Sequence, residues 1–431
     1  MSTPSAAQSR RAALGSFVGA VVEWYDFLLY GLVAATVLGQ VFFPESSPVA
    51  SRLAAFATLG VGFLFRPLGG IIFGHFGDRI GRKRMLVWTM TIMGVATALI
   101  GLLPTYAQIG WVAPLLLVVL RCVQGLAVGG EWGGAAMLAV ENAPRGLRAL
   151  FSSGVQIGYS VGLLLSTAAV SLLNSVLSDE AFTAWGWRIP FILSAILVAL
   201  GLWVRAGVAE SQEFIQVEKR LQQEDEPKRL PLFEAVRRYP AQLVQIIGLR
   251  FIELFSMYVV TTFALAFAVD NLGFERQTML NVNLFVGGLG ILTIPLFAYL
   301  ADKFGRMRVY LFGVVVGVVF AFPFFFALDK GAFIGIVICA IILVNIAHDA
   351  VVAVQQPLFA SMFPAEFRYS GAGTAYQVAA AIAGGFTPFI ATWLVAIGNG
   401  SWLGVAIYLV AGCLISGLCG IWVARTHREV D

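Results

Sequence analysis

The chain has 431 residues, of which 59% are hydrophobic and only 12% are charged. Soluble domains carry about 25% charged residues, so this composition excludes an ordinary soluble protein. The formal net charge of +4 is no indication of a nucleic-acid partner, because the basic residues follow a topological pattern instead.

Long apolar runs recur along the chain, and each is long enough to cross the roughly 30 Å hydrocarbon core of a lipid bilayer as a helix. Strands of a membrane barrel would alternate apolar and polar residues, and these runs do not. The sequence therefore predicts an all-α membrane protein. We expect twelve spans, near residues 15–43, 51–74, 85–104, 110–138, 149–173, 187–207, 239–268, 281–301, 309–328, 332–361, 369–395 and 402–424.

A polar segment separates the first six spans from the last six. We expect an N-terminal six-helix half at residues 1–207, a cytoplasmic linker at 208–238 and a C-terminal six-helix half at 239–431. The first apolar run is longer than the core of a signal peptide and has no clear cleavage site, so it is predicted to be a membrane helix.

Basic residues are divided unequally between the two alternating sets of loops. The set that includes both termini holds 21 of the 28 lysine and arginine residues, and the other set holds 4. Because cytoplasmic loops carry the excess of positive charge, both termini and the linker are expected in the cytoplasm.

A short polar stretch, residues 74–84 (GHFGDRIGRKR), follows the second span and returns in weaker form at residues 298–308 (AYLADKFGRMR). The first copy fits G-x-x-x-D-R-x-G-R-K and resembles the major facilitator superfamily. The second copy departs from it, with Ala298 in place of glycine and Met307 within the basic run. The resemblance implies the major facilitator fold, in which two six-helix halves open to one side of the membrane at a time.

An aspartate at the C-terminal end of a helix is disfavoured by the helix dipole, so Asp78 should contact a basic neighbour or the N-terminus of another helix. We expect a cytoplasmic latch that holds one access state. The alternative is a solvated turn that only anchors the topology. The residues of the expected latch are Gly74, Asp78, Arg79, Gly81, Arg82, Asp302 and Arg306.

Charged side chains inside the expected spans are costly in a bilayer and usually mark a transport pathway. They occupy every third span, beginning with the first, which fits four helices lining one central cavity near the membrane midplane. These residues are Glu23 and Asp26 in span one, Arg121 and Glu131 in span four, Arg250 and Glu253 in span seven, and His348 and Asp349 in span ten. Arg66 in span two lies outside this series.

The arginines indicate an anionic ligand, because a guanidinium can hold a carboxylate through two hydrogen bonds. Arg121 and Arg250 are the first candidates, and Arg66 is the third. Further substrate contacts are expected from hydroxyl, amide and aromatic side chains, although such residues more often join helices. These candidates are Gln124, Gln156, Tyr159, Asn345, Tyr25 and Tyr258.

The acidic residues and a histidine are candidates for proton coupling. Glu23 and Asp26 are three residues apart and share a helix face, so one of them can hold a proton in an apolar wall. Arg250 and Glu253 have the same spacing and are expected to pair. The full set is Asp26, Glu23, Glu131, Glu253, His348 and Asp349. The alternative is a set of structural ion pairs that fix helix register.

Nothing in the sequence indicates an enzyme, a metal or another cofactor. Residues 158–162 (GYSVG) fit a G-x-S-x-G nucleophile pattern, but they lie in mid-span without its strand–turn–helix context. Gly158 instead belongs to a G-x-x-x-G series with Gly154 and Gly162, which favours close helix packing.

A narrower resemblance covers nearly the whole chain. Residues 19–31 (GAVVEWYDFLLYG), 65–70 (FRPLGG), 121–134 (RCVQGLAVGGEWGG) and 185–194 (WGWRIPFILS) look like the metabolite:proton symporter family. Residues 152–166, 345–357, 368–379 and 384–391 resemble its shikimate-importing branch. The resemblance implies a bacterial inner-membrane symporter, expected to be monomeric, that carries protons together with shikimate, a hydroxylated carboxylate.

Three alternatives stay open at this point. A symporter for another solute, such as a dicarboxylate or a betaine, would share all features except the narrower stretches. A gradient-independent facilitator would exchange substrate without accumulating it. A membrane receptor would bind its ligand without moving it, but the sequence contains no sizeable soluble output domain.

Overall fold

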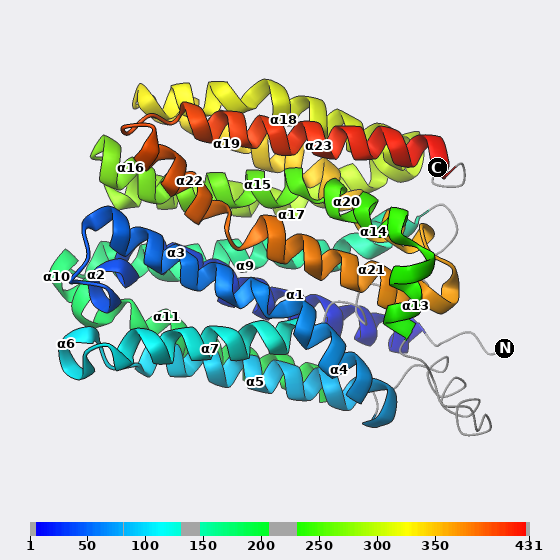
Figure 1. The fold of residues 1–431 in the computed structure, drawn as a ribbon, viewed down its shortest axis with the longest axis horizontal. Coiled ribbons are helices and arrows are strands. Elements are labelled where there is room, and N and C mark those ends of the chain that lie inside the picture. The colour runs from blue at the N-terminus through cyan, green and yellow to red at the C-terminus, as the bar shows by residue number, and fades with distance from the viewer. Residues whose placement is uncertain (1–5, 81, 131–146, 207–230, 428–431) are drawn as a thin grey trace.

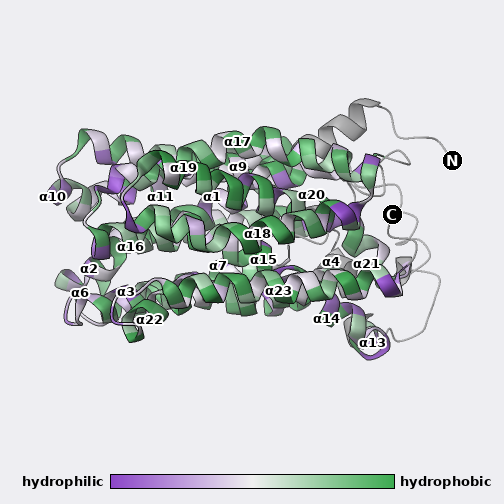
Figure 2. Ribbon diagram, turned by 90° about the horizontal axis from the view of Figure 1, so that it is seen from above, coloured by the Kyte–Doolittle hydropathy of each residue, from purple (hydrophilic) through white to green (hydrophobic). Residues whose placement is uncertain are grey.

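A computed structural model describes residues 6–80, 82–130, 147–206 and 231–427, and all regular elements within these ranges are helical. The long helices lie side by side along the long axis of the molecule, and the described ends of the chain lie at one end of the bundle (Figure 1). Hydrophobic residues follow the shafts of the helices, and hydrophilic residues gather toward the two ends (Figure 2). This distribution is the one that a bilayer requires.

The first half of the chain forms the helices drawn from blue to teal (Figure 1). They are α1 (Ala6–Val33), η1 (Ala34–Leu38), α2 (Gly39–Phe42), α3 (Pro48–Leu64), α4 (Arg66–Ile80), α5 (Arg82–Leu102), α6 (Tyr106–Ile109), α7 (Val112–Gly129), α9 (Arg148–Val176), α10 (Asp179–Ala181), η2 (Phe182–Gly186) and α11 (Arg188–Ala206).

The second half forms the helices drawn from green to red (Figure 1). They are α13 (Pro231–Arg238), α14 (Pro240–Leu249), α15 (Phe251–Tyr258), η3 (Val259–Phe263), α16 (Ala264–Leu272), α17 (Arg276–Phe304), α18 (Arg306–Asp329), α19 (Phe333–Ile341), η4 (Ile342–His348), α20 (Asp349–Ser361), α21 (Ala365–Ala379), η5 (Ala380–Gly384), α22 (Thr387–Ile397) and α23 (Leu403–Thr426).

Eleven continuous helices in the described part are long and apolar enough to cross a membrane, and a bent pair brings the number to twelve. The bent pair joins Asp179–Gly186 to Arg188–Val204 at an angle of 48°. The prediction of an all-α membrane protein with twelve spans is confirmed. Observed helix ends lie within a few residues of most expected span ends, although several helices continue beyond the apolar run into polar sequence.

Five of the spans contain a wide π-helical turn, labelled η1 to η5. Each turn continues directly from a preceding α-helix, and η1, η3, η4 and η5 lie in spans one, seven, ten and eleven. π-turns add one residue to a helical turn and are frequent at functional sites. They therefore mark the spans in which the regular helical ladder is interrupted inside the membrane.

The two polar stretches, residues 74–84 and 298–308, are largely helical in their described parts. Residue 81 alone separates α4 from α5, and Gly305 alone separates α17 from α18. Gly305 has a φ of 99°, a conformation that costs glycine little and lets the chain reverse within one residue. The basic residues of the second copy therefore lie on helix ends.

Small residues bring helices of the first half close together. A Cβ atom added at Gly158 of α9 would lie 2.6 Å from the Cβ of Ala20, and one at Gly162 would lie 2.8 Å from the Cβ of Trp24. Gly154, in the same series, has no such neighbour within 4 Å. Two of the three predicted packing glycines thus lie against α1.

The two halves touch at both ends of the bundle. At the end away from the termini, Arg52 of α3 forms an ion pair with Asp270 of α16. At the other end, the carboxylate of Asp302 accepts hydrogen bonds from the backbone N–H groups of Ala149 and Leu150, at 3.1 and 3.0 Å. The two halves are therefore in contact at both ends of the bundle, with the buried side chains of the spans between these contacts.

Candidate functional site

Charged side chains of both halves are buried between these end contacts. Asp26 and Arg121 are 0% exposed, Arg250 is 1% exposed and Glu253 is 3% exposed. Buried charges require partners, because an isolated ion loses its hydration without compensation. The partners of each charge therefore indicate which groups are structural and which can receive a ligand.

A chain of hydrogen bonds joins three helices of the first half. Arg121 donates to the Oε1 of Gln124 at 2.7 Å, and Gln124 donates to the hydroxyl of Thr97 at 2.6 Å. Thr97 donates in turn to the Oδ2 of Asp26 at 2.7 Å. This relay connects the buried carboxylate of α1 to the buried guanidinium of α7 without a direct ion pair.

Arg121 is held on further sides. Its Nε and one of its terminal nitrogens donate to the carbonyl oxygens of Thr58 and Leu59, at 3.4 and 3.3 Å. Its guanidinium lies 3.9 Å from the ring centroid of Tyr30, a favourable cation–π distance. Each of the three guanidinium nitrogens of Arg121 thus already donates a hydrogen bond within the protein.

Arg66 has a different environment. Its guanidinium lies 4.0 Å from the ring centroids of both Phe27 and Phe63, and one terminal nitrogen is 3.7 Å from the Oε1 of Glu23. Arg66 is only 2% exposed, yet its Nε and its other terminal nitrogen have no hydrogen-bond partner among the described residues. Buried donors without partners are rare and point to a missing ligand or water.

In the second half, Arg250 and Glu253 form the ion pair expected from their spacing. The two contacts are 3.0 Å from Nε to Oε2 and 2.8 Å from the second nitrogen to Oε1, a two-pronged arrangement. Arg250 also donates to the carbonyl oxygen of Tyr376 at 2.7 Å and lies over that ring. Gln355 donates to Glu253 at 2.7 Å, so this pair is well satisfied.

His348 and Asp349 form a second polar pair, with 2.9 Å between Nδ1 and Oδ1. The other oxygen of Asp349 accepts hydrogen bonds from Thr293 and from Asn345. The ring of Tyr159, from the first half, lies 5.0 Å from the ring of His348. The pair therefore lies where the two halves meet.

The two carboxylates of α1 each have a neighbour on a different helix. Asp26 accepts a hydrogen bond from Thr97 on α5, whereas Glu23 lies near Arg66 on α4. The shared helix face thus contacts two different helices.

The aromatic and amide candidates also divide. Tyr25 donates to the carbonyl oxygen of Pro190 at 2.9 Å, so its hydroxyl lies against α11. Gln156 donates to the carbonyl oxygen of Val352 across the interface between the halves, at 3.2 Å. The hydroxyls of Tyr159 and Tyr258 are buried and have no hydrogen-bond partner among the described residues.

Part of the expected site cannot be placed. Glu131 and Gly81 lie outside the described residues. Gly74, Asp78 and Arg79 belong to α4 and Arg82 begins α5, but the side chains of residues 74–80 and 82–83 lie outside the described part. Arg306 begins α18.

Sequence analysis did not single out Thr97, Thr293 or Tyr376. Each is an ordinary residue in an apolar helix, and its role depends on a neighbour from another helix. Spacing along one helix contains no signal for such a contact. Tyr376 does fall in one of the stretches that carried the narrower resemblance.

Comparison with known proteins agrees with this architecture. The model of the family described as Major Facilitator Superfamily matches residues 54–373, which is well over half of the chain. The chain belongs to the Major Facilitator Superfamily. It is accordingly a multi-pass inner-membrane transporter of small molecules and not an enzyme.

Relatives within the Major Facilitator Superfamily extend over almost the full chain. The "Shikimate transporter" of Escherichia coli (strain K12) is 58% identical over 426 residues, covering 99% of this chain and 97% of the relative. The "Inner membrane metabolite transport protein YhjE" of the same organism is 39% identical, covering 97% and 94%. The "Proline/betaine transporter" of that organism is 32% identical, covering 97% and 84%.

Solved structures of Major Facilitator Superfamily members show the same fold. The xylose transporter XylE of E. coli, in a partially occluded inward-open conformation, has a TM-score of 0.73 at 20% identity and covers 98% of each chain. The same symporter bound to 6-bromo-6-deoxy-D-glucose has a TM-score of 0.74 at 17% identity, covering 97% and 96%.

Proposed function

We propose that the chain is a proton-coupled symporter that imports shikimate, or a closely related hydroxylated carboxylate, by alternating access. The 58% identity to a shikimate transporter over 99% of the chain supports the substrate. The geometric observation that carries an anionic substrate is Arg66, a buried cation with two nitrogens that lack hydrogen-bond partners among the described residues. The enclosed charges between the two end contacts support alternating access.

Arg66 is the residue that we assign to the substrate carboxylate. Arg121 donates three hydrogen bonds within the protein, and Arg250 is held by Glu253 and by the carbonyl of Tyr376. Arg66 keeps two donors available, and a carboxylate accepting from both would give the two-pronged geometry that arginine favours. This assignment reverses the order suggested by the sequence, in which Arg121 and Arg250 came first.

Hydroxyl recognition is assigned to buried polar groups that lack partners in the described part of the protein. They are the hydroxyls of Tyr159 and Tyr258 and both amide atoms of Gln356. A site built to hydrogen-bond substrate hydroxyls discriminates strongly against analogues that lack them, because its own groups are then left unpaired. Tyr258 also makes an edge contact with Phe63, at 5.8 Å, and Phe63 lies against Arg66.

Asp26 is the residue that we assign to proton coupling. It is fully buried, and its Oδ1 has no hydrogen-bond partner among the described residues. Protonation would remove the negative charge of Asp26 and so its electrostatic attraction to Arg121, to which Asp26 is connected through Thr97 and Gln124. Glu253 is already neutralised by Arg250, so it is less suited to exchange a proton during each cycle.

The remaining assignments concern topology and the latch. We place both termini and the end of the bundle that holds Asp302 in the cytoplasm, following the distribution of basic residues. Asp302 contacts the first turn of α9 from the other half and acts as one arm of the cytoplasmic latch. The functional unit is the monomer, because one chain supplies both halves of the interface.

The test is uptake of labelled shikimate into vesicles that contain the purified protein, with and without an inward proton gradient. Accumulation only with the gradient supports the symporter and its substrate together. Equilibration regardless of the gradient would leave a facilitator and remove the role assigned to Asp26. Absence of shikimate uptake would mean that the substrate is another solute, such as a dicarboxylate or a betaine.

A further inference from the structure

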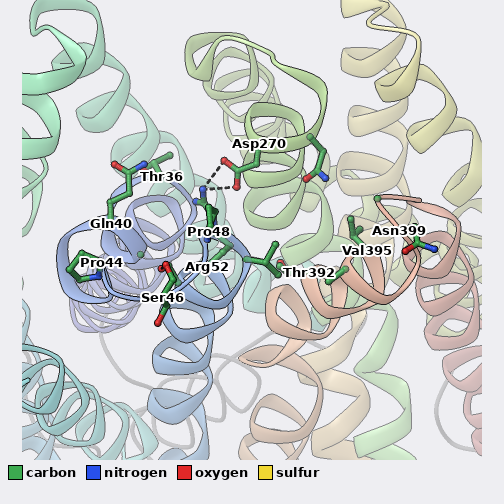
Figure 3. A pocket seen from close by; sticks show the side chains of 16 residues that line it. Thr36, Gln40, Pro44, Ser46, Pro48, Arg52, Asp270, Thr392, Val395 and Asn399 are labelled. Atoms are coloured by element: carbon green, nitrogen blue, oxygen red, sulfur yellow. Dashed lines mark hydrogen bonds and ion pairs between the residues drawn. The ribbon is translucent and has the colours of Figure 1, made fainter.

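A cavity of about 770 Å³ opens between the two halves (Figure 3). The elements that line it lie at the end of the bundle away from the termini (Figure 1). This volume lies within the range of about 300–1,000 Å³ typical of small-molecule sites. The first half contributes η1, α2 and the start of α3, and the second half contributes α16, α22 and the turn after α22. The cavity is separate from the buried charges described above, none of which lines it.

The lining of this cavity combines apolar and polar side chains and holds one charge of each sign. Among the described residues that line it, Arg52 is the single cation and Asp270 is the single anion (Figure 3). Amide and hydroxyl side chains, such as Gln40, Asn271 and Thr392, form other parts of the wall. One cation surrounded by hydrogen-bonding groups suits a small carboxylate that carries hydroxyls.

Arg52 is fixed in place, whereas Asp270 is accessible. One terminal nitrogen of Arg52 donates to the carbonyl oxygen of Ala35 in η1, and the side chain is 14% exposed. Its other terminal nitrogen contacts both carboxylate oxygens of Asp270, at 2.8 and 2.6 Å, and the Asp270 side chain is 40% exposed. Because the Asp270 side chain is partly exposed, a competing anion can reach this ion pair from the cavity.

We propose that this cavity is a capture site for the incoming substrate, in which Arg52 releases Asp270 and takes the substrate carboxylate. The proposal deepens the proposed function and rests on it, because the ligand is the transported hydroxylated carboxylate. Asp270 competes with the substrate for Arg52. Since the pair joins α3 of one half to α16 of the other, the exchange also frees the halves to separate at the entrance.

The experiment measures initial rates of shikimate uptake into right-side-out membrane vesicles as a function of external concentration. The substitution Arg52→Gln removes the cation and is expected to raise the apparent KM about tenfold, with little change in the maximal rate. Asp270→Asn removes the competitor and is expected to lower the apparent KM. Arg52→Lys keeps the charge without the planar fork and should give an intermediate value.

The opposite KM shifts expected for Arg52→Gln and Asp270→Asn distinguish a capture site from an ion pair that only closes the entrance. If the ion pair only closes the entrance, breaking it from either side has the same consequence, so both variants would shift the KM in the same direction and overturn the proposal. Arg276→Gln is the matched control, because Arg276 pairs with Asp179 and Asn174 at the same end but does not line the cavity. Its KM should equal that of the unchanged protein.

Two further readouts separate this inference from the proposed function. Uptake into inside-out vesicles starts at the other face, so its KM should be unaffected by Arg52→Gln. Shikimate methyl ester keeps the hydroxyls but lacks the charge. It should therefore compete with shikimate equally weakly in the unchanged protein and in Arg52→Gln. If the unchanged protein does not accumulate shikimate at all, the proposed function is wrong; if it does, and Arg52→Gln leaves the KM unchanged, only the capture site is wrong.

Discussion

Arg66 shows how partners decide the role of a buried charge. Three arginines lie inside the membrane-spanning part, and all are almost fully buried. Two of them have their hydrogen bonds satisfied by the protein, and the third is held mainly by aromatic faces that do not accept N–H groups in the plane of the guanidinium. The available donors of Arg66 therefore distinguish it from residues of the same type and burial.

The substitution Arg66→Gln is expected to abolish uptake, and Arg66→Lys to reduce kcat/KM by at least about tenfold, because lysine has a charge but no two-pronged donor. The measurement is labelled shikimate uptake at several concentrations. Arg188→Gln is a suitable control, since Arg188 donates to backbone carbonyls at the far end of α5. Uptake by Arg66→Gln equal to that of the control would contradict the assignment.

The substitution Asp26→Asn keeps the shape of the side chain but fixes it in a neutral form. We expect loss of gradient-driven accumulation, while exchange of internal for external substrate continues, because exchange needs no net proton movement. The assay compares uphill uptake with counterflow in the same vesicles. Accumulation that still responds to the proton gradient would show that another group carries the proton.

At the scale of helices, Gly158 and Gly154 of α9 differ in what lies against them. Gly158 lies against Ala20, and a methyl group there must push α9 away from α1. Gly158→Ala is expected to destabilise the protein by about 1–3 kcal/mol, the usual cost of overpacking. Gly154→Ala, on the same helix but with no neighbour within 4 Å, should have no such effect. Thermal unfolding in detergent compares the two, and equal losses would argue against the packing explanation.

Asp302 connects one half of the molecule to the first turn of a helix in the other half. Helix N-termini carry unpaired N–H groups and a positive partial charge, so a carboxylate there is favourable. Asp302→Ala is expected to cost about 1 kcal/mol, the typical effect of losing a cap. Hydrogen exchange should accelerate in the first turn of α9. The neighbouring Lys303→Ala is the control, and protection that survives in Asp302→Ala would contradict the contact.

At the scale of the whole molecule, the assignment of Asp26 as the one proton-exchanging carboxylate predicts how much net charge each transport cycle moves. Shikimate is a monoanion near neutral pH, so its import with a single proton moves no net charge. Accumulation should then follow the pH difference, at most about tenfold for each pH unit, and should not respond to membrane potential. A potential of 100 mV would supply about 2.3 kcal/mol only if charge moved. Vesicles with each gradient imposed separately provide the test, and accumulation driven by potential alone would require a second proton.

The spans and the membrane class could be predicted because they depend on local composition. The pairing of Arg250 with Glu253 was likewise expected, since three residues of spacing place them on one helix face. The same spacing did not predict which helices Glu23 and Asp26 would face, because each carboxylate contacts a different neighbouring helix. Sequence places residues on a face, but the contacts of that face depend on how the helices pack.

The order that we propose for the three arginines could not be predicted for the same reason. Arg121 and Arg250 belonged to a regular series along the chain, whereas Arg66 did not. Arg121 donates hydrogen bonds to backbone carbonyls of α3, and Arg250 donates one to the carbonyl of Tyr376 on α21. Backbone acceptors leave no trace in residue identity, so their effect on a distant arginine could not be read from the sequence.

The wide turn η1 has a consequence for how this protein tolerates insertions and deletions. Arg52 donates to the carbonyl oxygen of Ala35 within that turn. Deleting one residue from Ala34–Leu38 would restore a regular α-helical pitch, and it would thereby displace the Ala35 carbonyl oxygen that Arg52 contacts. The position of an arginine at the entrance is thus tied to the residue count of a neighbouring helix. Relatives that gain or lose a residue there should differ in how they admit substrate, even when both charged side chains are kept.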